Sequence, residues 1–231
     1  MNWNKFEELN IVFTEKQKQD LIKYKNILQE QNKIHNLTAI TQDQEIIDKH
    51  FYDSLIFTKV FNPDGLEILD IGTGAGFPGV VLKIMFPNSK IYLLESNGKK
   101  INFLNTVIKE LDLKNIWTLK VRAEEYSVEN KEKFDVIISR AMAPLNILLE
   151  VGVQALKIKG TFICLKSKNI ANELNELNGQ ETKLGLSLQK KQNYEDDILG
   201  ERNNLFYIKN SSTSIEYPRL YSQIRKRPLG K

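Results

Sequence analysis

Residues 66–79 read LEILDIGTGAGFPG, an apolar run followed by an acid and a glycine-rich turn. The apolar run predicts a buried strand of a parallel sheet. Gly72, Gly74 and Gly76 allow a ligand to approach the backbone closely, and Pro78 suits the first turn of a following helix. A strand, a glycine loop and a helix in this order are typical of a site for a nucleotide-like cofactor.

The spacing of the glycines bears on which cofactor this loop binds. The dinucleotide pattern G-x-G-x-x-G fails when it is counted from Gly72, because its last position falls on Phe77. It fits only when it is shifted to begin at Gly74. The pattern D-x-G-x-G-x-G, which begins at Asp70, fits better and is the usual loop of S-adenosylmethionine enzymes. We therefore favour S-adenosylmethionine over a dinucleotide.

A second strand is predicted at residues 91–96, IYLLES, and Glu95 lies at its end. A carboxylate in this place accepts hydrogen bonds from the ribose hydroxyls in nucleotide-binding α/β domains. We expect Glu95 to bind the ribose of the cofactor. The alternative is a glutamate that faces solvent at a strand end.

Strands and helices alternate along the rest of the chain, which predicts a doubly wound, mainly parallel, Rossmann-like α/β sheet of seven strands. We expect a helical extension over residues 1–62 and an α/β domain over residues 63–231, with the last two strands as an antiparallel hairpin at the sheet edge. Thr14 and Gln17 predict a capping box on the second helix. The predicted helices cover residues 4–11, 14–32, 43–60, 78–86, 97–111, 144–156 and 168–184, and the predicted strands 67–71, 90–95, 116–121, 134–139, 160–166, 186–194 and 204–209.

Composition narrows the class of protein. A chain of 231 residues with one cysteine and two histidines excludes a disulfide and a multi-cysteine metal site, so we predict no metal. The sequence has neither an apolar stretch that could span a membrane nor an N-terminal apolar leader, so we expect a soluble, cytoplasmic protein without membrane partners. The sequence shows neither a heptad repeat nor an exposed apolar stripe that would indicate an oligomer. We therefore expect a monomer.

The positive charge gathers at one end of the chain. Residues 217–231, YPRLYSQIRKRPLGK, hold five Lys and Arg and no acid, whereas the whole chain has a net charge of only +4. A short basic tail with two tyrosines suits the phosphate backbone of a nucleic acid. The alternative is a tail that only improves solubility.

Six motifs stand in a diagnostic order: NLTAI (36–40), HFYDSL (50–55), DIGTGAGFPG (70–79), LLESNGKKINFL (93–104), RAEE (122–125) and SRAMAPL (139–145), followed by the ending YPR…KRPL. From about residue 20 onward the chain resembles the ribosomal RNA small-subunit methyltransferase G family, also called glucose-inhibited division protein B. The resemblance implies the class I S-adenosylmethionine-dependent methyltransferase fold. It also implies methyl transfer to N7 of a guanine in a decoding-region loop of 16S ribosomal RNA, with S-adenosylhomocysteine as product and the 30S subunit as partner.

The resemblance also implies roles for residues that match the family motifs. The glycines would form the floor under the methionine part of the cofactor, and Asp70 would hold its ammonium group directly or through water. Ala123 and Glu124 would read the adenine edge with a backbone N–H and a carboxylate, although Glu124 is also suited to a helix start. The full set of expected cofactor residues is Asp70, Gly72, Gly74, Gly76, Phe77, Glu95, Ala123, Glu124 and Arg140.

Six basic residues are expected to contact RNA. Arg140 follows the fourth strand and faces the expected cleft, where a structural ion pair is its alternative role. Lys166 ends the fifth strand at the mouth of the same cleft. The tail supplies the remaining four, so the full set is Arg140, Lys166, Arg219, Arg225, Lys226 and Arg227.

The sequence contains no candidate nucleophile or general base, so we expect no catalytic residue in that sense. The segment after residues 134–140 reads AMAPL and lacks the polar-Pro-Pro-aromatic motif of amino-group methylation. Cys164 lies in the middle of an apolar strand, where a thiol is usually inert. Guanine N7 has an available lone pair and loses no proton on attack, so alignment is sufficient.

Three other functional classes remain open at this point. A methyltransferase of the same fold that acts on a small molecule would not need the basic tail. A ribosome-assembly factor that binds the cofactor without transferring a methyl group would also lack a base. Dinucleotide oxidoreduction comes last, because the glycine loop fits it only in the shifted register.

Overall fold

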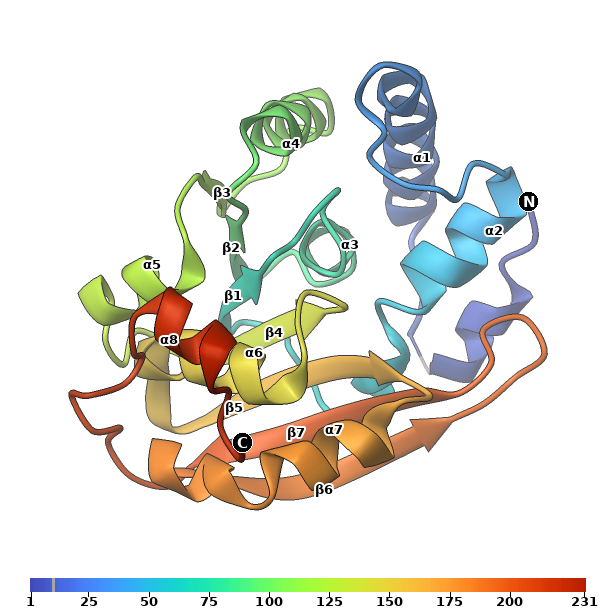
Figure 1. The fold of residues 1–231 in the computed structure, drawn as a ribbon. Helices are drawn as coiled ribbons and strands as arrows, with labels where there is room; N and C mark the ends of the chain where they lie inside the picture. Colours follow the sequence, from blue (N-terminus) through green and yellow to red (C-terminus); the bar gives the residue numbers. More distant parts are fainter. Residues whose placement is uncertain (10) are drawn as a thin grey trace.

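The computed structural model describes residues 1–9 and 11–231. A seven-stranded sheet runs through its centre (Figure 1). The strands are β1 (Glu67–Ile71), β2 (Lys90–Leu94), β3 (Ile116–Leu119), β4 (Phe134–Arg140), β5 (Leu156–Ser167), β6 (Leu186–Tyr194) and β7 (Arg202–Lys209). Their order is β3-β2-β1-β4-β5-β7-β6, with β1 to β5 parallel and with β7 antiparallel to both β5 and β6. The predicted seven-stranded, mainly parallel sheet with an edge hairpin is confirmed.

The helices follow the predicted alternation, with differences at their ends. Residues 4–9 form a 3-10 helix, and the helix predicted over 4–11 includes residue 10, which lies outside the described residues. The capping box of Thr14 and Gln17 is present at the start of α1. None of the described helices is long and apolar enough to cross a membrane. The α-helices are α1 (Glu15–His35), α2 (Asp43–Ile46), α3 (Gly79–Met85), α4 (Gly98–Glu110), α5 (Ala123–Glu129), α6 (Leu145–Gly152), α7 (Ile170–Leu177) and α8 (Tyr221–Lys226).

Three predicted helices are interrupted, and two short helices were not predicted. The helix predicted over 144–156 consists of α6 and a 3-10 turn at Val153–Ala155, and residue 156 already belongs to β5. After α2 the chain continues as a π-helical turn over residues 47–52 and a 3-10 turn over 56–59, in place of one helix over 43–60. The helix predicted over 168–184 ends at Leu177, because Asn178 and Gly179 both adopt the left-handed conformation that terminates helices, and a 3-10 turn follows at Gln180–Leu184. Helices α5 and α8 have only seven and six residues, too few for a clear periodic pattern.

Helices cover both faces of the sheet (Figure 1). Ile68 of β1 packs in a cluster with side chains of α1, α3 and α4, whereas the next residue, Leu69, packs in a second cluster with α6, α7 and α8. Successive residues of a strand point to opposite faces, so a strand covered on both sides is apolar throughout. This explains why Ile68 and Leu69, which precede Asp70 and face opposite sides of the sheet, are both apolar.

The N-terminal segment packs against the glycine-rich part of the sheet. Tyr24 of α1 is fully buried, and its hydroxyl donates a hydrogen bond to the Ala75 carbonyl. The side-chain amide of Gln17 donates to the backbone carbonyls of Ile84 and Met85 at the end of α3, at 3.2 and 3.0 Å. The glycine loop is therefore held between the sheet and α1.

Candidate functional site

The glycine loop leaves the end of β1 and is fastened to the end of β2. The amides of Gly72 and Thr73 donate to the Leu94 carbonyl at 2.8 and 3.2 Å. Gly76 has φ +97°, and a Cβ there would lie 2.6 Å from the Tyr24 hydroxyl, so only glycine fits. At Gly74, which has φ +62°, a Cβ would be in ordinary van der Waals contact with the Gly72 carbonyl at 3.9 Å and with Lys100 Nζ at 4.0 Å, so the backbone conformation rather than space favours glycine there.

Asp70 lies beneath this loop and joins its two ends. Its carboxylate is fully buried, and Oδ2 accepts hydrogen bonds from Thr73 Oγ1 at 2.6 Å and from the Gly79 amide at 2.8 Å. Oδ1 has no hydrogen-bond partner among the described residues. Burial raises the pKa of Asp70 to about 7, although the two hydrogen bonds act in the opposite direction. Asp70 therefore fastens the loop from below and has one buried acceptor atom left without a partner among the described residues.

A cavity of about 390 Å³, here called the narrow cavity, opens beside the loop. Glu95 lies in its wall and is only 8% exposed. Its Oε1 accepts from the Asn97 amide at 2.9 Å, and its Oε2 lies 3.6 Å from Lys100 Nζ. A carboxylate can accept about four hydrogen bonds, so Glu95 retains capacity for a ligand. Other lining residues include Val121, Ala123, Glu124, Ile147 and Val151.

Two further residues of the narrow cavity were not expected from the sequence. Tyr221 of α8 lines it, and the Arg122 guanidinium lies 4.4 Å from the centre of the Tyr221 ring. Arg122 Nε also donates to Glu124 Oε1 at 3.1 Å. The C-terminal segment thus reaches the cavity that holds Glu95 and Ala123, and the two tyrosines of the tail were the only local signal for it.

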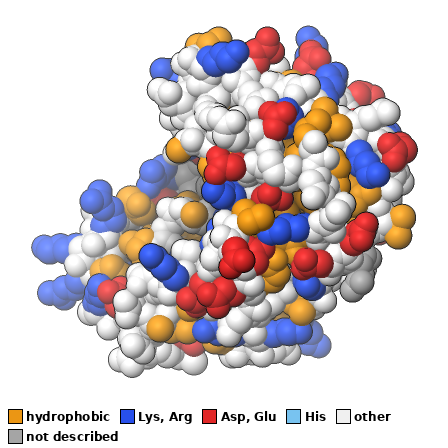
Figure 2. Space-filling view, turned by 90° about the vertical axis from the view of Figure 1, so that its right-hand side faces the viewer, with side chains coloured by type: hydrophobic (Ala, Val, Ile, Leu, Met, Phe, Trp, Pro, Cys, Tyr) orange, Lys and Arg blue, Asp and Glu red, His pale blue; other side chains and the backbone are white. Residues whose placement is uncertain are grey.

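A second, larger space of about 1040 Å³, here called the wide cleft, adjoins the narrow cavity. The two share Gly72, Arg140, Ala141 and Met142 in their walls. Figure 2 shows a hollow in this side of the molecule, with Lys and Arg side chains gathered along one edge. The remaining lining of the wide cleft includes Phe77, His50, Asp53, Lys166, Glu173 and Arg202.

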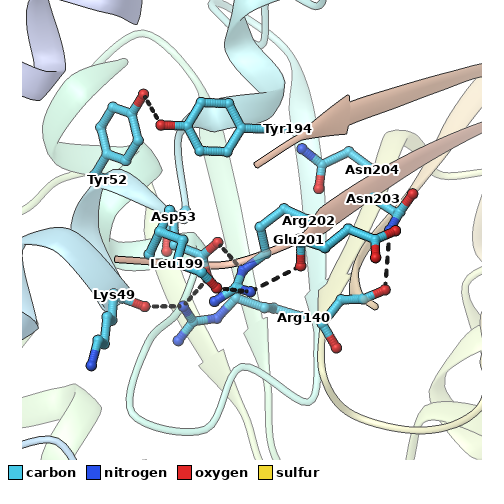
Figure 3. A network of polar contacts seen from close by, with 12 residues as sticks. Lys49, Tyr52, Asp53, Arg140, Tyr194, Leu199, Glu201, Arg202, Asn203 and Asn204 are labelled. Carbon is cyan, nitrogen blue, oxygen red and sulfur yellow. Dashed lines mark hydrogen bonds and ion pairs between the residues drawn. The ribbon is translucent and has the colours of Figure 1, made fainter. Parts of the chain in front are cut away.

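One carboxylate holds two arginines at the wide cleft (Figure 3). Asp53 Oδ2 accepts from Arg140 Nη1 at 3.1 Å, and Asp53 Oδ1 accepts from Arg202 Nε at 2.7 Å. Arg140 Nη1 also donates to the Lys49 carbonyl at 3.1 Å. The cations of β4 and β7 are thereby fixed by a residue of the N-terminal segment.

His50 is packed between Phe77 and this arginine. Its ring stacks on Phe77 with centroids 4.3 Å apart, and Arg140 lies 5.0 Å from the same phenyl ring. Because Arg140 Nη2 donates to His50 Nδ1 at 3.1 Å, the proton of the imidazole is on Nε2, which donates to Thr38 Oγ1 at 2.8 Å. Burial, followed by the charge of Arg140, lowers the pKa of His50 to about 3. His50 is neutral and both its nitrogens are engaged, so it is no general base.

The expected RNA contacts fall into two groups. Lys166 is nearly buried at the wide cleft and donates to Glu173 Oε2 at 2.7 Å and to the Ala143 carbonyl at 2.6 Å. Arg219 is paired with the fully buried Glu150, at 2.6 Å from Nη2 to Oε2. That pairing engages the Arg219 guanidinium with Glu150, as Glu173 engages Lys166, so the RNA contacts expected of Arg219 and Lys166 stay predictions. Arg225, Lys226 and Arg227 remain exposed.

Two other chemistries lack residues in the described part of the chain. Cys164 lies fully buried in β5, and burial raises the pKa of its thiol to about 12, so it is no thiolate nucleophile. Within residues 1–9 and 11–231, no three His, Cys, Asp or Glu side chains are grouped to hold a metal ion.

Comparison with known proteins decides the family. The family model described as rRNA small subunit methyltransferase G matches residues 17–206. The chain belongs to this family. The protein of Mycoplasma capricolum with that name is 48% identical over 226 residues, which cover 97% of each chain. A Clostridium botulinum relative with the same name is 42% identical over 228 residues, 96% of this chain and 95% of the other.

Solved structures support the class I methyltransferase fold of this rRNA methyltransferase G family member. TYW2 of M. jannaschii, solved in complex with AdoMet, aligns with a TM-score of 0.55 at 17% identity over 74% of this chain and 79% of the other. A SAM-dependent methyltransferase from Aquifex aeolicus aligns with a TM-score of 0.53 at 20% identity, covering 78% and 98%. At these identities the likeness concerns the fold alone.

The residues present suit the cofactor of this fold. The narrow cavity has a volume typical of small-ligand sites and offers Glu95 as an acceptor. Asp70 Oδ1 is buried near the loop without a partner among the described residues, which fits a cationic group nearby. The loop residues Gly72 and Gly74 line the wide cleft, next to the shared wall at Arg140.

Proposed function

We propose that this protein transfers a methyl group from S-adenosylmethionine to N7 of one guanine in the decoding-region loop of 16S ribosomal RNA. We further propose that it acts as a monomer on the 30S subunit in the cytoplasm. Family membership supports the reaction class. The observation that carries the proposal is the meeting of the narrow cavity and the wide cleft at Gly72 and Arg140–Met142.

The narrow cavity suits the adenosine half of the cofactor. S-adenosylmethionine supplies an electrophilic methyl group on its sulfonium. Glu95 would accept from the ribose hydroxyls, and the Ala123 amide with the Glu124 carboxylate would read the adenine edge. Asp70 would attract the ammonium group, directly or through water, with its free Oδ1. Phe77 and the glycine loop would bound the remaining part of the site from the wide cleft.

The wide cleft suits a nucleophile that needs no base. Asp53 is occupied by two arginines, Glu173 by Lys166, and His50 by Arg140 and Thr38. Guanine N7 attacks through a lone pair and releases no proton, so these side chains serve to position the base and exclude water. An amino-group or pyrimidine-carbon target would require a proton acceptor or a thiolate.

The RNA backbone would be held by the basic rim. Arg140 and Lys166 lie at the cleft, and Arg225, Lys226 and Arg227 are exposed on and after α8. Replacing those three tail residues by alanine should weaken 30S binding and reduce the slope of log affinity against log salt by about 2, at roughly 0.7 per lost contact. The variant Lys190→Ala/Lys191→Ala, at two exposed residues of the edge strand β6, is the control. An unchanged slope would remove the tail from the RNA interface.

The reaction is tested with labelled S-adenosylmethionine and 30S subunits that lack N7-methylguanine in the decoding-region loop. Fully modified subunits are the matched control. The 16S RNA is then cleaved with borohydride and aniline, which cut at N7-methylguanine. One new cleavage in the decoding-region loop is the expected result. Labelled RNA without this cleavage would mean that the methyl group goes to another atom. If the protein binds the cofactor but no RNA is labelled, a ribosome-assembly factor that transfers no methyl group is favoured.

A further inference from the structure

The segment that precedes α8 is fixed to α6 by a buried ion pair. Arg219 donates to Glu150 three times, from its amide and Nε to Oε1 at 3.0 and 2.8 Å and from Nη2 to Oε2 at 2.6 Å. The side-chain amide of Gln154 donates to the backbone carbonyls of Ser214 and Tyr217 at 3.0 and 2.7 Å. A fully buried carboxylate such as Glu150 requires this neutralisation, so the path of the segment is determined.

Helix α8 presents one face to the protein and another to solvent. Ile224 is fully buried, and Tyr221, three residues earlier, lies on the same side of the helix. Beyond the helix, Leu229 is 5% exposed and packs in the same cluster as Ile224. These apolar contacts hold Tyr221 at the wall of the narrow cavity.

Tyr221 also connects to the residue expected at the adenine edge. Its ring covers the Arg122 guanidinium at 4.4 Å, and Arg122 in turn bonds Glu124 at 3.1 Å. An aromatic ring beside a guanidinium and a carboxylate is suited to contact a flat heteroaromatic group and to exclude water from its hydrogen bonds.

We propose that Tyr221 is part of the cofactor site, where it contacts the adenosine half of S-adenosylmethionine, and that the Arg219–Glu150 pair is its positioning element. This rests on the proposed function for the identity of the ligand. The C-terminal segment, which the sequence alone presents as a basic tail, thus completes the narrow cavity as well as carrying charges on its outer face.

Binding of two probes to the purified full chain tests the proposal. S-adenosylhomocysteine contains both halves of the cofactor, and 5′-methylthioadenosine lacks the amino-acid end. Tyr221→Ala should weaken both by the same factor, about tenfold, because the lost contact is with the adenosine. Tyr221→Phe keeps the ring and should bind within about twofold of wild type. Gln223→Ala, on the exposed side of α8, is the matched control.

The outcomes separate the inference from the function on which it rests. If wild type binds neither probe, the proposed cofactor is wrong. If wild type binds and Tyr221→Ala binds equally well, the role of Tyr221 is overturned. A loss for S-adenosylhomocysteine alone would overturn the assignment to the adenosine half.

A second measurement covers the case in which Tyr221→Ala disturbs α8 itself. In wild type, S-adenosylhomocysteine should slow amide hydrogen exchange in residues 221–226, and Glu150→Gln should diminish both this protection and the affinity several-fold. Exchange in α8 that is the same with and without S-adenosylhomocysteine would contradict the proposal whatever the variants show.

Discussion

The narrow cavity and the wide cleft share a wall yet differ in how their carboxylates are engaged. In the narrow cavity, Glu95 has one backbone donor at 2.9 Å and a lysine at 3.6 Å, which leaves acceptor capacity. In the wide cleft, Asp53 has a guanidinium on each oxygen. The arrangement around Glu95 is suited to accept hydrogen bonds from the hydroxyl and amino groups of a ligand. The arrangement around Asp53 is suited to hold cations in place before any ligand arrives.

This difference predicts that removing Asp53 damages folding. Asp53→Ala should lower the free energy of unfolding by about 3 kcal/mol, because Arg140 and Arg202 would lose their shared anion. The lower end of the usual range applies, since these side chains keep 16% and 22% exposure. Affinity for S-adenosylhomocysteine should change less than about threefold. Urea unfolding and calorimetric titration measure the two effects.

The control is Glu45→Ala, which removes a half-exposed pair with Lys49 in the same segment. Its effect should stay below about 0.5 kcal/mol. If the two variants unfold alike, Asp53 does not organise the wide cleft.

Removing Glu95 should weaken cofactor binding and leave stability nearly unchanged, which is the reverse of the effect of removing Asp53. Glu95→Ala should weaken S-adenosylhomocysteine about 30-fold, because two ribose hydroxyls would lose a charged acceptor. Stability should change little, since the protein contacts of Glu95 are few. The carboxylate of Glu125, next in the chain to the cavity residue Glu124, is exposed, and Glu125→Ala is the control. A large loss of stability with intact binding would reverse the comparison between the two spaces.

Asp70, below the loop that serves both spaces, should give stability a distinctive pH dependence. Its pKa of about 7 in the folded protein exceeds its ordinary value of 3.8, so the folded state retains the proton that the unfolded state releases. Its contribution to stability is therefore complete below pH 3.8 and is lost as the pH rises through 7, at up to about 1 kcal/mol per pH unit. Asp70→Asn keeps the oxygen that accepts from Thr73 and Gly79 and removes this slope.

Urea unfolding of wild type and Asp70→Asn at pH 5, 6, 7 and 8 measures the difference. If the free energy of unfolding changes with pH equally in the two proteins, the Asp70 carboxyl has its ordinary pKa in the folded state. Above pH 7 the variant should also bind S-adenosylhomocysteine more weakly, because only the charged carboxylate attracts an ammonium group.

The smallest expected effect concerns His50. With a pKa of about 3 it stays neutral from pH 6 to 8, and N7 attack releases no proton, so kcat at saturating cofactor should be flat over this range. Single-turnover methylation at several pH values measures this. A sigmoidal rise near pH 6.5 would identify a histidine base and contradict the view of the wide cleft as a site without one.

The parts of the fold that depend on neighbouring residues were predictable. The glycine loop, the acid at the end of β2 and the edge hairpin all follow from local patterns, and the structure has each of these elements. The capping box of Thr14 and Gln17 depends on a spacing of three residues and was also found. Helix α8 was missed because its apolar side has only Tyr221 and Ile224 within six residues.

Pairings between distant residues could not be predicted. Arg219 looks like a free tail charge until the fold brings it to Glu150, 69 residues earlier. Asp53 lies in the motif HFYDSL (50–55), yet nothing local points to Arg202. The role of Tyr221 depends on where the chain returns after β7, and a single sequence does not specify that path.

The ties of the N-terminal segment have a consequence for how the chain matures during synthesis. Asp53 and Arg202 are 149 residues apart, and the Tyr52 hydroxyl bonds Tyr194 across 142 residues. At 5–20 residues per second, roughly 7 to 30 s pass between the translation of one partner and the next. During that interval Phe61, whose ring packs 6.2 Å from that of Phe206 in β7, awaits the strand that completes its surroundings. The part of the N-terminal segment around Asp53 therefore completes its contacts only after β7 has been made.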